Sequence, residues 1–187
     1  MCKMLGHGTN YLGSPFEMSK QTKIDQGVIK DLQATYTQTF PAIAKLADWV
    51  QRELIETGYL VTPLGRKRWF FGKRDERDTL KQAVAFLGQS MTADEMNLAM
   101  LQLWRLNIVQ ILLQVHDSIL IQYPEEKENE IIPQVLAAMR VPIELEAGRT
   151  FIVPVEVKVG WNWSKQSSDN PLGLAKWPDE RRGRLTS

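Results

Sequence analysis

The chain of 187 residues is 43% hydrophobic and 24% charged, the composition of a folded globular domain rather than of a disordered tail. Lysine and arginine together number 23 and aspartate and glutamate 22, so the net charge of +1 excludes a general affinity for polyanions. Any nucleic-acid surface therefore has to come from local clustering of basic residues. The single cysteine, Cys2, excludes an intramolecular disulfide framework and a multi-cysteine metal site.

No part of the sequence approaches the ~20 consecutive apolar residues that a membrane-spanning helix requires. The longest apolar region, residues 108–121, is interrupted by polar side chains at Gln110, Gln114, His116 and Asp117. The first eight residues lack the apolar core of a signal peptide. We therefore expect a cytoplasmic protein with no membrane partner.

The N-terminal part of the sequence predicts three helices followed by a hairpin. Helical spacing covers residues 3–12, 24–39 and 41–57. Ser14-Pro15 is expected to end the first helix, Phe40-Pro41 to divide the second from the third, and Gly58 to end the third. Residues 59–71 then predict two short strands joined by a turn at Pro63-Leu64-Gly65.

The C-terminal part predicts one long helix, an apolar hairpin, a shorter helix and a β-rich region. In chain order these elements cover residues 78–104, 108–123, 125–139 and 140–160. The buried side of the long helix is expected to consist of Leu80, Val84, Leu87, Met91, Leu98 and Leu101. From Ser164 onward, serine, proline, glycine and charged residues predict a poorly packed tail. The mixture predicts an α+β fold, with helices covering one side of a largely antiparallel sheet.

Two short motifs place polar groups where they can bind a ligand. Asp117 follows His116 at the tip of the apolar hairpin, where a carboxylate can hold a hard divalent cation or simply make local hydrogen bonds. Lys3, His7 and Tyr11 are spaced on one helix face, so a cation and two rings can take up a triphosphate, a sugar and a base. The alternative for this second motif is a frayed, solvated helix.

Two further motifs suit contacts with nucleic acid. Five of the nine residues in 66–74 are basic, among them Arg66 and Arg68, and three are aromatic. Such a patch is compatible with phosphate contacts, and equally with a solvated hairpin tip. Lys81, Gln89 and Thr92 lie near one face of the long helix, where Gln89 can contact base edges and Lys81 a phosphate, unless the face is merely solvated.

The order of these motifs along the chain resembles that of the family A DNA polymerases. Lys3 to Tyr11 resembles motif B, the fingers helix of that family, and Tyr36-Thr37-Gln38-Thr39-Phe40-Pro41 resembles the following fingers segment. Thr62-Pro63-Leu64-Gly65-Arg66-Lys67-Arg68 resembles the Thr-Leu-Gly-Arg-Arg-Arg hairpin. Gln89-Ser90-Met91-Thr92-Ala93-Asp94 is similar to the Gln-Gly-Thr-Ala-Ala-Asp helix start, Gln114-Val115-His116-Asp117 to motif C of the palm, and 157–163 to the closing strand. Within that family, the chain most resembles the phage-encoded branch.

The resemblance implies template-directed DNA synthesis by two-metal phosphoryl transfer with Mg²⁺, dNTP and primer-template DNA. It implies that Asp117 is a catalytic metal ligand and that His116 contacts the primer end. Lys3, His7 and Tyr11 would bind the incoming nucleotide, and DNA would be contacted by Arg66, Arg68, Lys81, Gln89 and His116. The implied fold is a helical fingers part over residues 1–75, a palm-like antiparallel sheet over 76–163 with the motif C hairpin, and a tail over 164–187.

Three positions depart from the family pattern: Leu12 replaces a glycine, Ser118 a glutamate, and His7 a phenylalanine or tyrosine. Because His-Asp-Ser also occurs in single-subunit phage RNA polymerases, RNA synthesis stays a candidate. Motif A, with the second metal-binding aspartate, has no counterpart in the sequence.

We therefore expect the C-terminal part of a polymerase in a bacterial or phage-infected cytosol, inactive without an N-terminal fragment that carries motif A. The alternatives are a catalytically dead remnant that only binds DNA, and an unrelated α+β binding protein with coincidental motifs.

Overall fold

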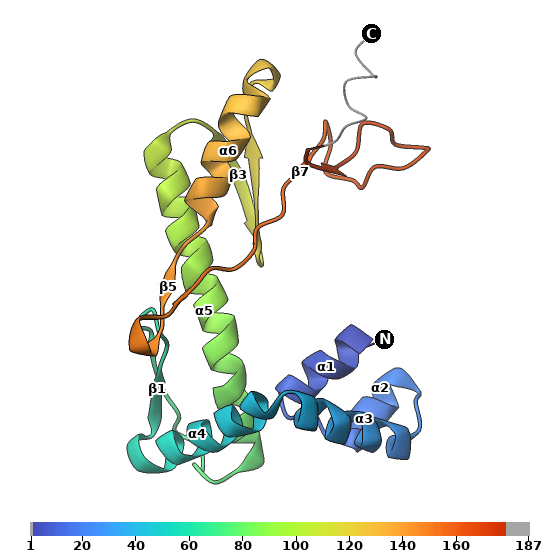
Figure 1. Ribbon diagram of the computed structural model, residues 1–187, viewed down its shortest axis with the longest axis vertical. Helices are drawn as coiled ribbons and strands as arrows, with labels where there is room; N and C mark the ends of the chain where they lie inside the picture. Colours follow the sequence, from blue (N-terminus) through green and yellow to red (C-terminus); the bar gives the residue numbers. More distant parts are fainter. Residues whose placement is uncertain (1, 179–187) are drawn as a thin grey trace. The chain divides into compact units, whose positions relative to one another are not determined.

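The computed structural model describes residues 2–178, which divide into two compact units between Asp94 and Glu95 (Figure 1). Unit 1 comprises the described residues up to Asp94, and unit 2 those from Glu95 onward. The fold is α+β, as predicted, but within the described residues the strands form separate two-stranded antiparallel sheets rather than one large sheet. No helix in the described part of the chain is long and apolar enough to cross a membrane.

Unit 1 begins with four helices. Their bounds are α1 Cys2–Asn10, α2 Pro15–Thr22, α3 Gln26–Thr39 and α4 Pro41–Thr57. The break before Pro41 and the end of α4 at Gly58, whose φ is 78°, confirm the prediction. Helix α2 was not predicted, because Ser14-Pro15 was interpreted only as the end of the first helix. Ser14 in fact caps α2 through a reciprocal pair of hydrogen bonds with Glu17, with proline in the first helical turn.

A β-hairpin and the first half of the long helix complete unit 1. Strands β1 Tyr59–Val61 and β2 Lys67–Trp69 pair antiparallel, with Tyr59 opposite Trp69. The turn is closed by Thr62, whose backbone N–H donates to the Arg66 carbonyl at 2.9 Å and whose hydroxyl accepts from the Arg66 N–H at 3.1 Å. The core beneath it consists of Val50, Leu54, Leu60, Phe70, Ala83, Val84 and Phe86.

Helix α5 spans Arg77–Leu106, within two residues of the prediction, and passes from unit 1 into unit 2. Its expected buried side is correct for Val84 but wrong for Leu98 and Leu101, which are exposed. In unit 2 the helix instead buries Leu103 against another set of residues. One continuous buried face could not be predicted for the whole helix, because its N-terminal half packs in the core of unit 1 and its C-terminal half in the core of unit 2.

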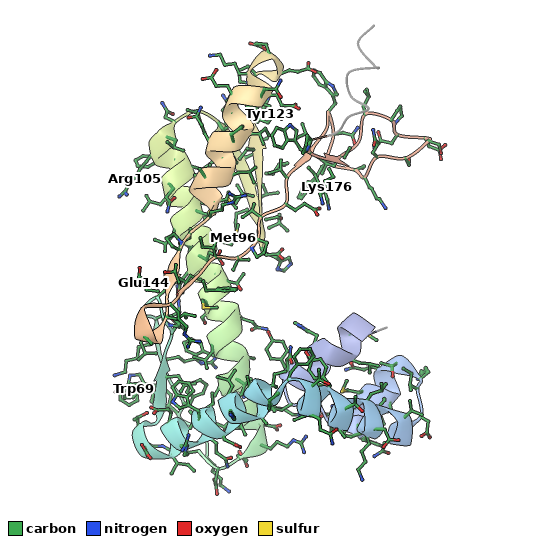
Figure 2. The ribbon with its side chains drawn as sticks, in the orientation of Figure 1. Trp69, Met96, Arg105, Tyr123, Glu144 and Lys176 are labelled. Carbon is green, nitrogen blue, oxygen red and sulfur yellow. The ribbon has the colours of Figure 1, made fainter. Side chains whose placement is uncertain are left out.

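The remaining part of unit 2 joins α5 to a second hairpin and a helix (Figure 1). Strands β3 Gln110–Val115 and β4 Ser118–Gln122 pair antiparallel, and α6 Glu128–Met139 follows a short 3₁₀ turn, η1 Glu125–Lys127. Leu103 of α5, Ile131, Val135 and Ala138 of α6, and one face of the hairpin form the core. The hydroxyl of Tyr123, the residue that follows β4 and is labelled in Figure 2, donates to the Glu128 carboxylate of α6 at 3.1 Å.

The β-rich region predicted for 140–160 contains only short strands. They are β5 Ile143–Glu144, β6 Thr150–Phe151 and β7 Lys158–Val159, with a 3₁₀ turn, η2 Glu146–Gly148, between the first two. The alternating valines at 153, 155 and 157 lie outside any strand, so periodicity alone was misleading there. Pro154 cannot donate a ladder hydrogen bond, and a strand requires a partner as well as alternation.

The segment that we interpreted as a tail folds back in its described part, up to residue 178. Strand β8 Ala175–Lys176 pairs with β7, and the Trp161 N–H donates to the Leu172 carbonyl at 2.8 Å. The two chain segments approach so closely that a Cβ on Gly160 would lie 2.7 Å from the backbone of Gly173. Only glycine fits at that distance, so Gly160 fixes this close crossing.

Candidate functional site

The first cluster of predicted site residues lies at the end of α1. His7 is exposed and packs edge-on against Tyr11, with ring centroids 4.7 Å apart and an interplanar angle of 84°. The Tyr11 N–H donates to the His7 carbonyl at 3.2 Å, and Leu12 then turns the chain with φ 58°. That left-handed conformation ends the helix and costs leucine more than it would cost glycine. Lys3 lies on the same helix, at the i−4 position from His7.

The same cluster reaches α5 within unit 1. A Cβ on Gly88 would lie only 3.7 Å from the Tyr11 hydroxyl, and Tyr11 and Leu12 both pack against the unit 1 core. Gln89, the next residue along α5, is exposed. The structure therefore brings Tyr11 of α1 close to Gly88, the residue before Gln89, although the two motifs are far apart in sequence.

The predicted phosphate-binding residues Arg66 and Lys81 both have carboxylate partners. Arg66 donates hydrogen bonds to Asp94 from two groups. Its Nε lies 2.9 Å from each carboxylate oxygen, and its Nη2 also donates to Oδ1. The hydrogen bond and the charge of Asp94 raise the pKa of Arg66. Lys81 Nζ lies 3.1 Å and 3.3 Å from the two oxygens of Glu17. Arg66 and Lys81 can therefore neutralise a phosphate only if each breaks its ion pair with the carboxylate, or binds the carboxylate and the phosphate together.

Glu17 combines two structural roles. Its carboxylate accepts hydrogen bonds from the Ser14 N–H and hydroxyl at 3.0 Å and 2.9 Å while it pairs with Lys81. The backbone hydrogen bond from Ser14, followed by the hydrogen bond and charge of Lys81, lowers the pKa of Glu17 from 4.5 to about 2. The carboxylate thus joins the start of α2 to α5.

The other basic residues of the β1–β2 hairpin lie against aromatic rings. The Arg68 guanidinium lies 4.8 Å from the Phe70 ring and 5.7 Å from the Phe86 ring, and its Nη2 donates to Gln82 Oε1 at 3.4 Å. Lys67 Nζ lies 3.6 Å from the Tyr59 ring and 4.4 Å from the Trp69 ring, which Figure 2 labels. Both cations remain exposed, so this hairpin presents positive charge to solvent.

The second cluster lies at the tip of the β3–β4 hairpin in unit 2. Val115 pairs with Ser118, so His116 and Asp117 form a two-residue turn, in which His116 has φ 51°. Gln114 Nε2 donates to the His116 carbonyl at 2.6 Å, and the Ser118 hydroxyl donates to the Val115 carbonyl at 2.8 Å. These bonds fix the turn and leave the side chains of His116 and Asp117 exposed.

Asp117 supplies one hard oxygen donor but does not make a metal site by itself. Among the described residues there is no group of three or more His, Cys, Asp or Glu side chains that could hold a metal ion. Mg²⁺ prefers octahedral oxygen coordination and is usually held by one or two carboxylates together with substrate phosphates. The residues present therefore fit a part of a magnesium site rather than a complete one.

Three further residues near these clusters were not assigned a role from the sequence. Asp94 was quoted within its motif but given no role, although a carboxylate there can pair with a hairpin arginine. The Ser14-x-x-Glu17 spacing was an available signal for a helix start. Nothing in the sequence distinguishes Asn10, whose buried Oδ1 has no hydrogen-bond partner among the described residues. An unpaired buried acceptor costs about 1–3 kcal/mol, so a donor from water or a ligand would be favourable there.

Comparison with known families shows the class of protein to which this chain belongs. The family model described as DNA polymerase family A matches residues 1–165, and the chain belongs to that family. Family membership carries divalent-metal-dependent DNA synthesis as a general property of the class, although the described residues contain no complete metal site.

Several curated relatives are DNA polymerases I. The chain is 28% identical to DNA polymerase I of Treponema pallidum over 176 residues, covering 87% of this chain and 17% of that protein. It is 29% identical to the thermostable DNA polymerase I of Thermus filiformis, covering 89% of this chain and 20% of that protein. The chain is 25% identical to the chloroplastic/mitochondrial DNA polymerase I B of Arabidopsis thaliana, covering 86% of this chain and 16% of that protein. The chain thus spans about a fifth or less of the length of these relatives.

A solved structure has a similar fold. The POL domain of Pol1 from M. smegmatis, in complex with DNA primer-template and dNTP, matches with a TM-score of 0.66 and 24% identity. The match covers 73% of this chain and 26% of that one. At this level of identity the likeness concerns the fold, which is that of a polymerase domain in mixed helices and small antiparallel sheets.

Proposed function

We propose that this chain supplies the nucleotide-binding and one metal-binding part of a template-directed DNA polymerase that transfers nucleotides from dNTP to a primer 3′-hydroxyl. The observation that carries the proposal is the position of Tyr11, whose ring packs against His7 and whose hydroxyl lies 3.7 Å from where a Cβ on Gly88, the neighbour of Gln89, would be. This places α1, whose side chains can bind an incoming nucleotide, near Gln89, which can contact the newly formed base pair. A resemblance in sequence order alone would not require the two motifs to meet.

In this proposal the side chains of α1 hold the incoming nucleotide. Lys3 contributes the cation for the triphosphate, His7 lies against the sugar, and Tyr11 lies beside the templating base. Gln89 then contacts minor-groove acceptors of the nascent pair, whose degenerate pattern suits a check of pair shape rather than of sequence. Arg66, Arg68 and Lys81 contact DNA phosphates, Arg66 and Lys81 by exchanging their carboxylate partners.

The hairpin of unit 2 serves the reacting end of the primer. The Gln114 and Ser118 hydrogen bonds hold the turn, so that His116 contacts the primer terminus and Asp117 provides one carboxylate of a Mg²⁺ site. Asp117 would hold Mg²⁺ there together with a second carboxylate, and the metal would supply charge stabilisation for the primer 3′-hydroxyl and the leaving pyrophosphate. A second carboxylate would come from a partner polymerase segment carrying motif A, and residues 1–75 and 76–163 would be the fingers and palm parts. The setting we propose is the bacterial or phage-infected cytosol.

Substitution of Asp117 tests the proposal. The full chain is co-expressed with a polymerase segment that carries motif A and the thumb, and primer extension and primer-template binding are both measured. Asp117→Ala is expected to lower turnover by orders of magnitude while DNA binding persists, because the carboxylate acts on the reaction rather than on the DNA. Asp31→Ala, at an exposed position of α3, is the matched control and is expected to leave turnover unchanged.

The other outcomes separate the alternatives. Equal turnover in the two variants would remove Asp117 from the chemistry. DNA binding without any extension in the complemented complex would favour a catalytically dead DNA-binding remnant. Extension with ribonucleoside but not deoxyribonucleoside triphosphates would favour an RNA polymerase.

A further inference from the structure

The outward face of the β1–β2 hairpin in unit 1 carries exposed aromatic and apolar side chains. Side chains alternate along a strand, so Lys67 and Trp69 of β2 project to one side and Arg68 to the other, and Phe71 follows two residues after Trp69. Phe70 and Leu60 are buried in the unit 1 core, which makes the other side the outward one. Across the pair, Tyr59 lies opposite Trp69 and Val61 opposite Lys67.

Two aromatic rings on this outward face are unusually exposed. Trp69 is 50% exposed and Phe71 94% exposed. A phenylalanine that is almost fully exposed gains nothing from the hydrophobic effect in the folded chain, because its ring has not left water. It lies two residues beyond Trp69, the last residue of β2.

Trp69 is held in place, which makes the surface a fixed platform rather than a loose side chain. Its ring lies 4.7 Å from the Tyr59 ring, tilted by 57°. The Lys67 ammonium lies over both rings. A ring fixed in this way loses little conformational entropy when a flat ligand stacks on it.

The positive charge around these rings favours a negatively charged ligand. From Gly58 to Arg74 the sequence contains five basic residues and no acidic one. Arg66 is paired with Asp94, but Lys67 and Arg68 lie against rings and keep their charges exposed. Flat exposed rings bordered by cations are the arrangement that binds single-stranded nucleic acid, in which unpaired bases stack and the backbone follows the positive charge. A duplex buries its base faces and cannot use such rings.

We propose that the outward face of the β1–β2 hairpin is a stacking site for unpaired bases of a DNA single strand, with Trp69 and Phe71 as the stacking rings and Lys67 as a phosphate contact. The proposal rests on the proposed function in one respect, the choice of DNA as the polyanion. It adds a site outside the nucleotide and primer clusters, on the opposite side of the hairpin from Arg68. Its sequence preference is weak, because every base offers a flat face.

The test uses the full chain and two probes: an oligodeoxythymidylate of about 12 nucleotides and a blunt duplex. Trp69→Ala and Phe71→Ala are each expected to weaken binding of the single strand about ten-fold, and to leave duplex binding unchanged. Trp69→Phe retains a ring and is expected to restore binding while it removes most of the tryptophan-emission quenching that the oligonucleotide causes. Lys67→Gln is expected to reduce the slope of the logarithm of the binding constant against the logarithm of salt concentration by about 0.7.

A matched control and the contrary outcomes complete the test. Trp104, 71% exposed on the unit 2 part of α5, is replaced by alanine and is expected to leave both affinities unchanged. Unchanged single-strand binding in Trp69→Ala and Phe71→Ala, with duplex binding intact, overturns the stacking site and leaves the proposed function standing. Failure of the unsubstituted chain to bind either probe counts against both. A change confined to the oligomeric state of the aromatic variants assigns the surface to protein contacts and overturns the proposal.

Discussion

At the scale of single residues, the His7–Tyr11 pair shows how much a side-chain contact adds to helical spacing. The spacing places both rings on one face of α1, but it does not show whether they touch each other or anything else. The structure has the His7 ring edge-on against Tyr11, and Tyr11 against the glycine of another helix. His7 is the exposed member of the pair, so it is the residue that a ligand would meet first.

Substitution of His7 is expected to change the choice between sugars. His7→Tyr and His7→Phe alter both the stacking surface and the hydrogen-bonding capacity that face the incoming nucleotide. We expect both variants to change the ratio of dideoxynucleotide to deoxynucleotide incorporation by the complemented polymerase. The ratio is measured from chain termination in a primer-extension assay, with Met4→Leu, an exposed position on the same helix, as the control. An unchanged ratio in both His7 variants would place this residue outside the sugar site.

Glu17 gives a prediction about acid stability. Its pKa falls from 4.5 in the unfolded chain to about 2 in the fold, so the unfolded state binds more protons between those values. Stability that depends on this carboxylate is therefore fully present above about pH 4.5 and is lost as the pH falls toward 2. Glu17→Gln is expected to lower the urea midpoint near neutral pH, and this deficit is expected to shrink on acidification across that window.

The control for this prediction is Glu126→Gln, at an exposed position of η1. It is expected to leave the urea midpoint unchanged near neutral pH. A Glu17→Gln deficit that stays constant from neutral pH to about pH 3 would mean that the loss comes from the helix cap geometry and not from the charge.

At the scale of elements, the Arg66–Asp94 pair joins the β1–β2 hairpin to α5. A two-pronged arginine–carboxylate contact is directional, so it fixes the hairpin against the helix as well as neutralising the arginine. The same contact competes with DNA, because a guanidinium held by a carboxylate is less available to a phosphate. Arg66 therefore cannot fully hold the hairpin against α5 and bind a DNA phosphate at the same time.

This competition predicts opposite signs for the two partners. Arg66→Ala, alone and with Arg68→Ala, is expected to weaken primer-template binding uniformly across sequences and to flatten its salt dependence. Asp94→Asn is expected to strengthen binding and steepen the salt dependence, because it leaves Arg66 free for a phosphate. Binding is measured by fluorescence anisotropy at several salt concentrations on two unrelated sequences. Weaker binding in both single variants would show that the pair acts only by holding the hairpin in place.

At the scale of the whole molecule, the apolar edges of the β3–β4 hairpin in unit 2 set the expected behaviour of the chain alone. Among the described residues each of these strands pairs only with the other. Leu112 and Leu113 on β3 are 53% and 44% exposed. Open strand edges with exposed apolar side chains favour aggregation or pairing with another chain.

We expect the purified chain alone to show no magnesium-dependent primer extension and marginal solubility. Co-expression with a segment carrying motif A is expected to raise both, because it supplies an edge partner and a second carboxylate. Leu112→Lys in the isolated chain is expected to reduce light scattering without restoring extension, since a charge on the edge opposes pairing but adds no metal ligand. Robust extension by the chain alone would require a second metal-binding carboxylate within its own residues.

The sequence by itself determined most elements and the family. The proline and glycine breaks at Pro41 and Gly58 located helix ends because their backbone constraints are local. The two apolar runs around His116-Asp117 predicted the hairpin, because two strands joined by a two-residue turn need no distant partner. Motif order identified the family, since order is a property of the sequence alone.

Only the tertiary structure decided which of these residues meet. Val153 and Val155 alternate as a strand should but lie outside any strand, whereas Val159 pairs with Ala175 of β8, because pairing is not encoded in one segment. The partners Asp94 of Arg66 and Glu17 of Lys81 come from distant parts of the chain, so no local pattern could name them. The contact of Tyr11 with Gly88 depends on how α1 and α5 pack in unit 1, and packing is decided by the shape of a shared core rather than by spacing along either helix.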